Sequence, residues 1–446
     1  MHITFIRPSI YGKRGHDAME PLVFSILVGL TPDDISYDLY DERIESIPFD
    51  KPTDLVAITI ETYTARRAYQ IASMYRQRGI PVVAGGYHVT FLPDEALHYV
   101  DSVVLGDAEL VWQQVIADAA SGNLQKKYSG KGQPSLVGLN YDRSIFAGKK
   151  YTPVLPVQYS RGCRFACDFC SIHAFYGTSV RNRPVEEVVE EIRRSKKHFV
   201  LIVDDNIFVD VDAAKALFEA MIPLNIRWGC QISIDVAWDD ELLDLMQRSG
   251  CIAALVGFES LDTGNLRQMA KGWNVKQGSY QDALNKFYKH GIMVYGSFIF
   301  GYDHDTTDCF QKTVDFAIQS NMFIVNFSGL QPTPGTRLYD RLQKENRIIF
   351  DRWWLNPDYR YGDITYRPAN MTADELTQGC YDARMQFYSY SSAFKRLRGR
   401  INRRSMSHLM LYLGANWINR RELMQKLGQQ LGTPDVLDTS LLPAMA

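Results

Sequence analysis

Two successive series of short apolar segments, each alternating with helical segments, constrain the fold of this 446-residue chain more than any other feature. Strands that alternate with helices predict a parallel sheet covered by helices on both faces. The first series predicts a Rossmann-like α/β domain over residues 1–125. Its expected strands are Ile3–Ile6, Ser36–Leu39, Leu55–Ile60, Pro81–Ala84 and Ser102–Leu105, and its expected helices are Pro21–Leu30, Thr64–Arg78, Asp94–Tyr99 and Glu109–Ala120.

The second series begins after a polar, glycine-containing linker at 126–152 and spans residues 153–340. Six βα units predict a partial (β/α)6 barrel, in which residues at the carboxyl ends of the strands face a ligand. Residues 341–446 are expected to form a helical C-terminal domain, with a helix over Ala373–Tyr390 capped by Thr372. The six expected barrel strands are Pro156–Ser160, Phe199–Val203, Ile226–Ser233, Ala253–Phe258, Ile292–Phe300 and Phe323–Ser328.

Polar residues or glycines stand where several of these barrel strands end. Such a series on otherwise apolar strands is hard to explain by packing, because buried polar groups need partners. Asp204, after the second strand, has the alternative role of a helix N-cap. The positions of interest are Gln231 and Ser233 after the third strand, Glu259 after the fourth, and Gly301 and Tyr302 after the fifth.

Three cysteines, spaced Cys163-x3-Cys167-x2-Cys170, follow the first barrel strand. Three thiolates at this spacing suit a cubane of four irons whose fourth iron stays open, whereas a closed electron-transfer cluster is held by four cysteines. A zinc site that uses His173 as a fourth ligand is an alternative, although structural zinc ligands usually come in two pairs. Packing is a weaker explanation, since the chain's other four cysteines are scattered singly.

This spacing, with the aromatic Phe169 before the third cysteine, resembles the cluster loop of the radical S-adenosylmethionine (SAM) enzymes. The resemblance implies a [4Fe-4S] cluster held by the three cysteines, with SAM on the open iron. It also implies contacts to SAM. Phe169 would face the adenine, and Gly301 and Tyr302 would make contact from the end of the fifth strand. The ribose and amino acid end would be held by Gln231, Ser233 and Glu259.

The fourth and fifth N-terminal strands are followed by Gly85-Gly-Tyr-His88 and Gly106-Asp-Ala-Glu109, at the edge of a parallel sheet where ligands bind. These loops resemble those of a cobalamin-binding domain. The resemblance implies cobalamin contacts, although a simple turn is the alternative for the Gly-Gly pair. The Asp-x-His-x-x-Gly motif that supplies a lower cobalt ligand is absent, and His16 and His88 are poor substitutes. The implied contact residues are Thr59, Glu61, Gly85, Gly86, Tyr87 and Gly106.

The composition is that of a globular protein, with 46% hydrophobic and 22% charged residues. The formal charge of −2 gives no overall positive charge of the kind that nucleic-acid binding requires. No secretory signal or long apolar run is visible, which with seven cysteines predicts a cytoplasmic protein. The basic run Lys395–Arg404 and the apolar Met406–Ile418 leave two alternatives. They are peripheral contact with the inner membrane face through 395–418, or a solvated basic helix packed on the barrel.

The resemblance as a whole implies a B12-binding-domain radical SAM enzyme. Such an enzyme cleaves SAM reductively and, with cobalamin, methylates an unactivated carbon of a small molecule, either a lipid or a tetrapyrrole. A flavodoxin- or ferredoxin-type donor would supply the electron, and no catalytic base is assigned. The alternative is a non-methylating radical SAM cyclase or carbon–carbon bond-forming enzyme with a vestigial or redox-only cobalamin domain. A non-catalytic Fe–S or zinc-binding module would explain the cysteines but not the polar strand ends.

Overall fold

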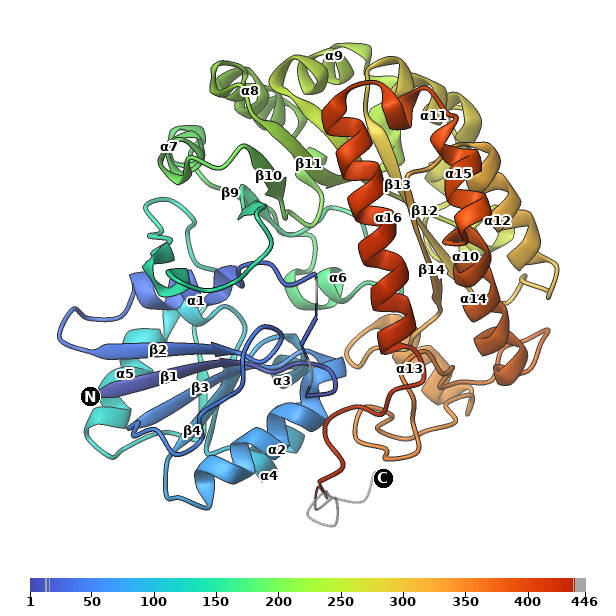
Figure 1. The fold of residues 1–446 in the computed structure, drawn as a ribbon. Helices are drawn as coiled ribbons and strands as arrows, with labels where there is room; N and C mark the ends of the chain where they lie inside the picture. The colour runs from blue at the N-terminus through green and yellow to red at the C-terminus, as the bar shows by residue number, and fades with distance from the viewer. Residues whose placement is uncertain (13, 16, 436, 438–446) are drawn as a thin grey trace.

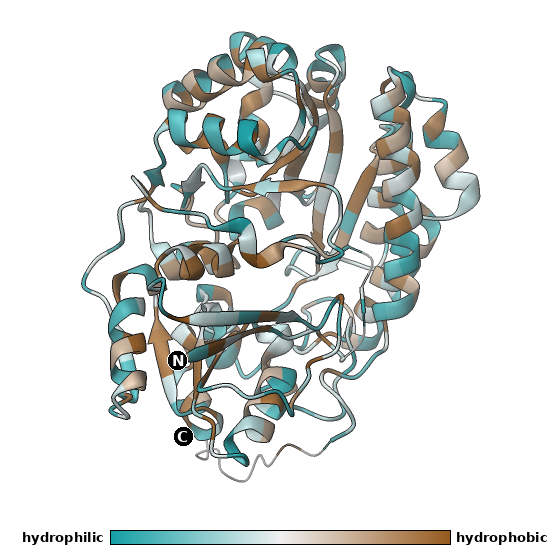
Figure 2. Ribbon diagram, turned by 60° about the vertical axis from the view of Figure 1, so that its left-hand side comes forward, coloured by the Kyte–Doolittle hydropathy of each residue, from teal (hydrophilic) through white to brown (hydrophobic). Residues whose placement is uncertain are grey.

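A computed structural model describes residues 1–12, 14–15, 17–435 and 437 of the chain. Two six-stranded parallel sheets form its framework, and a group of helices near the C-terminus packs beside the second sheet (Figure 1). Several strands consist largely of hydrophobic residues, whereas the outer helices carry many hydrophilic residues (Figure 2). Among the described residues, no helix has the length and apolar character needed to cross a membrane.

The N-terminal sheet has the strand order β2-β1-β3-β4-β5-β6, and all its pairs are parallel. Helices α2 and α4 pack on one face of this sheet, while α1 and α5 pack on the other. The order reverses beside β1, so the loops after β1 and β3 lie at a topological switch point. The elements are β1 (His2–Arg7), α1 (Leu22–Gly29), β2 (Ser36–Asp41), β3 (Leu55–Thr59), α2 (Ala65–Arg76), β4 (Val82–Gly85), α3 (Tyr87–Phe91), α4 (Pro93–Tyr99), β5 (Ser102–Leu105), α5 (Trp112–Ala120) and β6 (Lys127–Ser129).

The second sheet has the order β14-β13-β12-β11-β10-β7 and forms a partial barrel with β7 and β14 at its edges. Residues that alternate along β11 to β14 are buried against the outer helices, while those between them face a more open interior. The strands are β7 (Leu155–Val157), β10 (Phe199–Ile202), β11 (Arg227–Ile232), β12 (Cys251–Glu259), β13 (Met293–Phe300) and β14 (Ile324–Gly329). The helices around them are α6 (Ser171–Tyr176), α7 (Val185–Ser195), α8 (Val211–Met221), α9 (Asp240–Ser249), α10 (Thr263–Gln268), α11 (Tyr280–Lys289), α12 (Cys309–Gln319) and α13 (Arg337–Lys344).

The C-terminal helices cover the open side of the barrel at β14. They are α14 (Ala373–Phe387), α15 (Tyr390–Leu397) and α16 (Met406–Lys426), and Thr372 caps α14 as expected. The segment between barrel and helices crosses to the N-terminal domain, where Trp353 and Trp354 are buried against the core beside α2 and α4. The Trp354 indole donates to Glu95 over 2.9 Å. The expected α/β class, partial barrel and helical extension are therefore present.

Two local differences from the sequence expectations have clear physical causes. Residues Lys127–Ser129, expected in the linker, add strand β6 to the N-terminal sheet. The first barrel strand stops at Val157, because the amides of Tyr159 and Ser160 donate to the carboxylate of Asp204, each over 2.7 Å. Ser160–Arg161 then forms β8, which pairs antiparallel with β9 (Arg181–Asn182).

Candidate functional site

The three cysteines of the motif line one chamber of about 400 Å³ at the carboxyl ends of the barrel strands. Burial raises the pKa of each thiol, that of Cys167 to about 12, while the Lys271 ammonium opposes this shift at Cys167. No three His, Cys, Asp or Glu side chains of the described residues could together hold one metal ion. A zinc site needs such convergence, whereas each thiolate of a cubane binds its own iron.

Two acidic side chains, the buried Asp204 and the half-buried Asp205, fix the loop that carries the cysteines. Asp204 accepts hydrogen bonds from the Tyr159 and Ser160 amides and from the Ser160 hydroxyl over 2.6 to 2.7 Å. Asp205 accepts the Gly162 amide over 2.9 Å. The N-cap of α8 is Asp210, so the alternative N-cap role for Asp204 was wrong. These bonds set the path of the chain into Cys163.

Glu259 projects into the same chamber from a strained backbone. Its φ is +64°, a left-handed value that is uncommon outside glycine, and the β12–β13 register shifts there. The carboxylate is buried and pairs with the Lys271 ammonium over 2.6 Å. A strained, buried ion pair beside three thiols is typical of a functional site.

Other polar and aromatic residues add to the lining of this chamber, among them Phe169, Asn206, Gln231 and Ser233. Gln231 donates to the Asp205 carbonyl over 3.0 Å, and Asn206 donates to the Ser233 hydroxyl over 3.2 Å. Phe169 lines the chamber as well. The structure therefore brings together the predicted Phe169, Gln231, Ser233 and Glu259 with all three cysteines.

Gly301 and Tyr302 are not among the residues that line this chamber. The Tyr302 hydroxyl donates to Asp168 over 2.6 Å and so supports the cysteine loop from behind. A side chain on Gly301 would meet the Tyr366 hydroxyl at 2.2 Å, so packing requires a glycine at this position. Both positions therefore have structural roles, and the SAM contact expected of them from the sequence stays a prediction.

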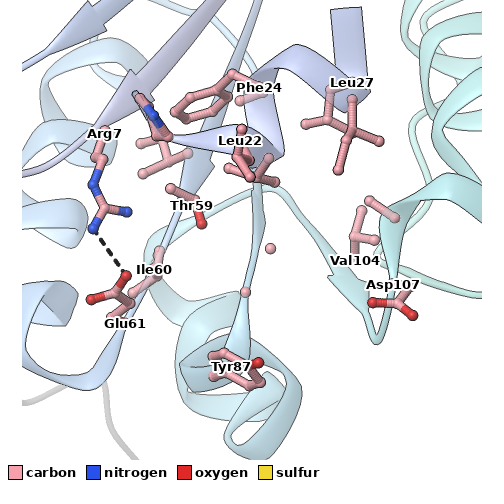
Figure 3. A pocket seen from close by; sticks show the side chains of 18 of the residues that line it. Arg7, Leu22, Phe24, Leu27, Thr59, Ile60, Glu61, Tyr87, Val104 and Asp107 are labelled. Atoms are coloured by element: carbon pink, nitrogen blue, oxygen red, sulfur yellow. Dashed lines mark hydrogen bonds and ion pairs between the residues drawn. The ribbon is translucent and has the colours of Figure 1, made fainter. Parts of the chain in front are cut away.

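A second cavity, of about 440 Å³, lies between the N-terminal sheet and the barrel. All six residues implied as cobalamin contacts line it: Thr59, Glu61, Gly85, Gly86, Tyr87 and Gly106. Apolar side chains of α1 form part of the opposite wall, and Phe175 and Tyr176 of α6 enter from the barrel side. Figure 3 shows Thr59, Glu61 and Tyr87 around this space, with Leu22, Phe24 and Leu27 of α1.

The three glycines of this cavity have different roles. Gly86 has a φ of +107°, and an added Cβ would lie 2.6 Å from the Ile60 carbonyl oxygen, so the fold itself requires it. An added Cβ on Gly85 would make only ordinary contacts at 3.8 Å, and one on Gly106 would meet nothing within 4 Å. Space next to Gly85 and Gly106 is therefore left open to the cavity.

An ion pair at the switch point supplies charge to this cavity. Arg7, which ends β1, donates to Glu61 after β3 over 3.0 Å (Figure 3). The guanidinium holds the pKa of the Glu61 carboxyl below its usual value. The Nε–H of Arg7 is buried and has no hydrogen-bond partner among the described residues. A ligand with acceptor oxygens would satisfy this donor.

His88, one of the two histidines considered as a cobalt ligand, does not line the cavity. His88 is buried in the core of the N-terminal domain, where its Nε2 lies 3.0 Å from Glu95 and its ring faces Trp354. His16 lies outside the described residues. None of the described residues lining the cavity is a histidine.

A third cavity, of about 360 Å³, opens beside the chamber of the cysteines and shares Ser328, Gly329 and Gln331 with it. It lies between β13 and β14 on one side and α16 on the other. Its lining combines tyrosine rings with polar groups, among them Tyr63, Tyr295, Asn326, Tyr361, Arg384 and Tyr388. The two spaces are therefore direct neighbours.

Two groups at the site escaped prediction from the sequence. Lys271 follows a short helix without any motif, and only the fold brings it to Glu259. Arg161 joins the barrel to the N-terminal domain through Asp107 at 3.2 Å and Glu109 at 2.6 Å. The polar turn 106–109 follows an apolar strand and lies at the edge where parallel strands end. It therefore indicated that Asp107 and Glu109 would lie at the ligand-binding edge, where Arg161 contacts them.

The fold and the chamber define a radical SAM protein with an added N-terminal α/β domain, and a sequence model of the Radical SAM superfamily matches residues 157–317. The chain is 32% identical to bacteriochlorophyllide d C-12(1)-methyltransferase of Chlorobaculum tepidum, over 81% of this chain and 80% of the relative. It is 28% identical to the C-8(2)-methyltransferase of the same organism, over 74% and 78%. The chain belongs to the B12-binding-domain radical SAM family of methyltransferases.

A solved structure shows the same fold over nearly the whole chain. It is the radical SAM methyltransferase TsrM of Kitasatospora setae with cobalamin and a [4Fe-4S] cluster bound, at a TM-score of 0.69 and 15% identity, covering 95% of this chain and 98% of that one. The family and enzyme class expected from the sequence are thus confirmed.

Proposed function

We propose that this protein is a cobalamin-dependent radical SAM enzyme that methylates a carbon of a small molecule. The observation that carries the proposal is the placement of two cavities around one loop. Cys163, Cys167 and Cys170 line the barrel chamber, while Phe175 and Tyr176, a few residues further along the chain, line the interdomain cavity. Groups bound in the two cavities would be separated by a single short segment.

In the barrel chamber, the three cysteines would hold a [4Fe-4S] cluster, which supplies the electron for reductive cleavage of SAM. Phe169, Gln231, Ser233 and Glu259 would bind SAM beside it. A carboxylate can accept hydrogen bonds from the N–H and O–H groups of SAM, and Glu259 is held by a buried partner, Lys271. Residues of the barrel thus orient SAM and exclude water.

In the interdomain cavity, Thr59, Glu61, Gly85, Gly86, Tyr87 and Gly106 would bind cobalamin, which supplies the methyl group when bound. The fit rests on the open space beside Gly85 and Gly106 and on the unpartnered Nε–H of Arg7. An amide-bearing ligand offers acceptors for that donor. The described residues that line the cavity include no histidine, so this described lining offers no histidine ligand to the cobalt.

The third cavity would receive the substrate, because it adjoins the SAM chamber and is lined by aromatic rings. Two relatives named as bacteriochlorophyllide methyltransferases support a tetrapyrrole over a lipid as the substrate class. They also favour methyl transfer over the alternative of a non-methylating cyclase.

The test is an anaerobic reaction of the reconstituted enzyme with bacteriochlorophyllide d and SAM labelled in its methyl group with deuterium. Methyl transfer predicts a labelled tetrapyrrole, with 5′-deoxyadenosine and S-adenosylhomocysteine formed in equal amounts. Formation of 5′-deoxyadenosine without S-adenosylhomocysteine would contradict methylation and support the non-methylating alternative. A Cys167→Ala control should form neither product.

Two further partners belong to the proposal. A flavodoxin- or ferredoxin-type protein would deliver the electron to the cluster, as the chemistry of reductive SAM cleavage needs a one-electron donor. The protein would work in the cytoplasm, in peripheral contact with a membrane through 395–418.

A further inference from the structure

The outer face of α15 and α16 carries an unusual concentration of exposed apolar side chains. Seven large hydrophobic residues on these helices are between 52% and 78% exposed. Elsewhere in the described residues, only Val137 is as exposed as any of them. The seven are Tyr390, Phe394, Met406, Met410, Leu413, Trp417 and Met424.

The apolar residues of α16 form a stripe that does not contribute to the core. Met406, Met410, Leu413, Trp417 and Met424 recur at intervals of three, four or seven residues, which places them on one face of a helix. Residues of the opposite side anchor the helix to the protein. Tyr412 is buried and donates to the Ala393 carbonyl, and His408 bonds to the Gly291 carbonyl over 2.8 Å.

Uncompensated positive charge surrounds this stripe. The segment 390–426 contains nine Lys or Arg residues and one acidic residue, Glu422, in a chain whose formal charge is −2. Arg396 is buried, Arg404 donates to backbone carbonyls, and Lys426 pairs with Asp17 and Glu422. The other six lie within 4 Å of no carboxylate among the described residues; they are Lys395, Arg398, Arg400, Arg403, Arg420 and Arg421.

Cations and exposed rings are interleaved on this face. Arg398 lies over the ring of Phe394 at 5.2 Å, and Arg420 of α16 lies over Tyr390 of α15 at 4.6 Å. The second contact shows that the outer sides of α15 and α16 form one continuous surface. Apolar side chains flanked by Lys and Arg are typical of a helix lying in the interface of an anionic membrane.

We infer that the α15–α16 face docks on an anionic lipid surface. This deepens the peripheral contact proposed above and does not depend on methyl transfer. A second copy of the chain is a poor occupant, because two strongly positive faces would repel each other. The inner side of α16 lines the third cavity through residues such as Ile418 and Leu423. Docking would therefore place the proposed substrate cavity one helix away from the lipid.

The test is flotation of the full-length protein with vesicles of phosphatidylcholine alone or with about one third phosphatidylglycerol. The expected result is binding to the anionic vesicles that is at least about tenfold tighter than to the neutral ones. A Phe394→Ser/Met410→Ser/Leu413→Ser variant should lose about tenfold in affinity, as should Arg398→Gln/Arg400→Gln/Arg403→Gln. Val137→Ser, an equally exposed site on a loop far along the chain, should bind as wild type.

Formation of 5′-deoxyadenosine from SAM in solution should remain the same in all these variants, which shows that they are folded and separates this inference from the proposed chemistry. Wild-type protein that does not bind anionic vesicles would overturn the inference, as would binding that neither triple variant weakens. A dimer in sedimentation that the apolar variant converts to monomer, without vesicle binding, would assign the face to self-association instead.

Discussion

At the scale of single residues, the pair of Glu259 and Lys271 concentrates the charge of the proposed SAM site. Both side chains are buried, and their 2.6 Å contact leaves each dependent on the other. In the proposed complex the carboxylate accepts hydrogen bonds from the Lys271 ammonium and from an N–H or O–H group of SAM. Its left-handed backbone conformation directs it into the chamber.

Glu259→Gln should therefore weaken SAM binding by about tenfold or more with iron content unchanged, since a hydrogen bond to a charged group contributes about 1.5–3 kcal/mol. Equilibrium binding of SAM to the cluster-reconstituted protein measures this. Glu241→Gln, at an exposed carboxylate on α9, is the matched control and should bind SAM normally. Unaltered affinity in Glu259→Gln would exclude this residue from the site.

Asp204 makes stability depend on pH. Burial raises its pKa to about 7, and the hydrogen bonds from Ser160 and Tyr159 only partly oppose this. In the unfolded chain the carboxyl has a pKa of about 3.9. Between about pH 3.9 and about pH 7 the folded state keeps a proton on Asp204 that the unfolded state has lost. The free energy of unfolding therefore falls as the pH rises, by up to about 1.4 kcal/mol per pH unit.

Asp204→Asn should remove this component, so that the difference in unfolding free energy between pH 5 and pH 7 becomes smaller than in wild type. Urea unfolding at both pH values measures the slope, independently of any constant loss of stability. The exposed N-cap variant Asp210→Asn should keep the wild-type slope. Parallel pH curves for wild type and Asp204→Asn would show that Asp204 is ionised throughout.

The sequence was a good guide to residues that lie near one another along the chain or that end parallel strands. The six residues expected at the interdomain cavity line it, because all of them follow strands of one sheet. It was a poor guide to Lys271 and His88. Lys271 pairs with Glu259, and His88 contacts Glu95 and Trp354. These contacts depend on packing between segments that no local pattern links.

At the scale of elements, Arg396 ties α15 to the barrel from inside a basic run that looks solvent-exposed in the sequence. It is buried and donates to the carbonyls of Met322, Phe323 and Phe387 and to the Asn416 side chain, over 2.9 to 3.1 Å. The run 395–404 thus combines a structural anchor with surface cations.

Arg396→Gln should lower the free energy of unfolding by at least about 2 kcal/mol, because it leaves buried carbonyls without donors. Hydrogen exchange should accelerate selectively in α15 and α16. Arg398→Gln, two residues away and exposed, should change stability by less than about 0.5 kcal/mol. Equal effects of the two substitutions would contradict the anchoring role of Arg396.

The boundaries of the strands, like the positions of single residues, could be predicted from the sequence only where a local pattern determines them. The strand candidates of both sheets were close to those observed, because their apolar runs are clear. Strand β6 was missed because Lys127–Ser129 is short and only its tyrosine is buried. The first barrel strand was expected to run on to Ser160, because the sequence gives no sign that Asp204 would capture its amides.

At the scale of the whole molecule, the two domains meet through buried charges next to the proposed cofactor sites. Arg161 and Arg181 of the barrel both pair with Asp107, and Tyr176 donates to the same carboxylate over 3.0 Å. Since Tyr176 follows the cysteine loop and Asp107 lines the interdomain cavity, this cluster connects the two cavities. The contact between the two domains thus lies between the proposed sites for the [4Fe-4S] cluster with SAM and for cobalamin.

The most direct test of this account is the iron and cobalt content of the protein after anaerobic reconstitution with iron, sulfide and hydroxocobalamin. The account predicts about four irons and one cobalt per chain. A Cys163→Ala/Cys167→Ala/Cys170→Ala variant should lose the iron and retain the cobalt, because the two sites use different residues. About four irons without cobalt in the wild-type protein would contradict the account and leave the non-methylating radical chemistry.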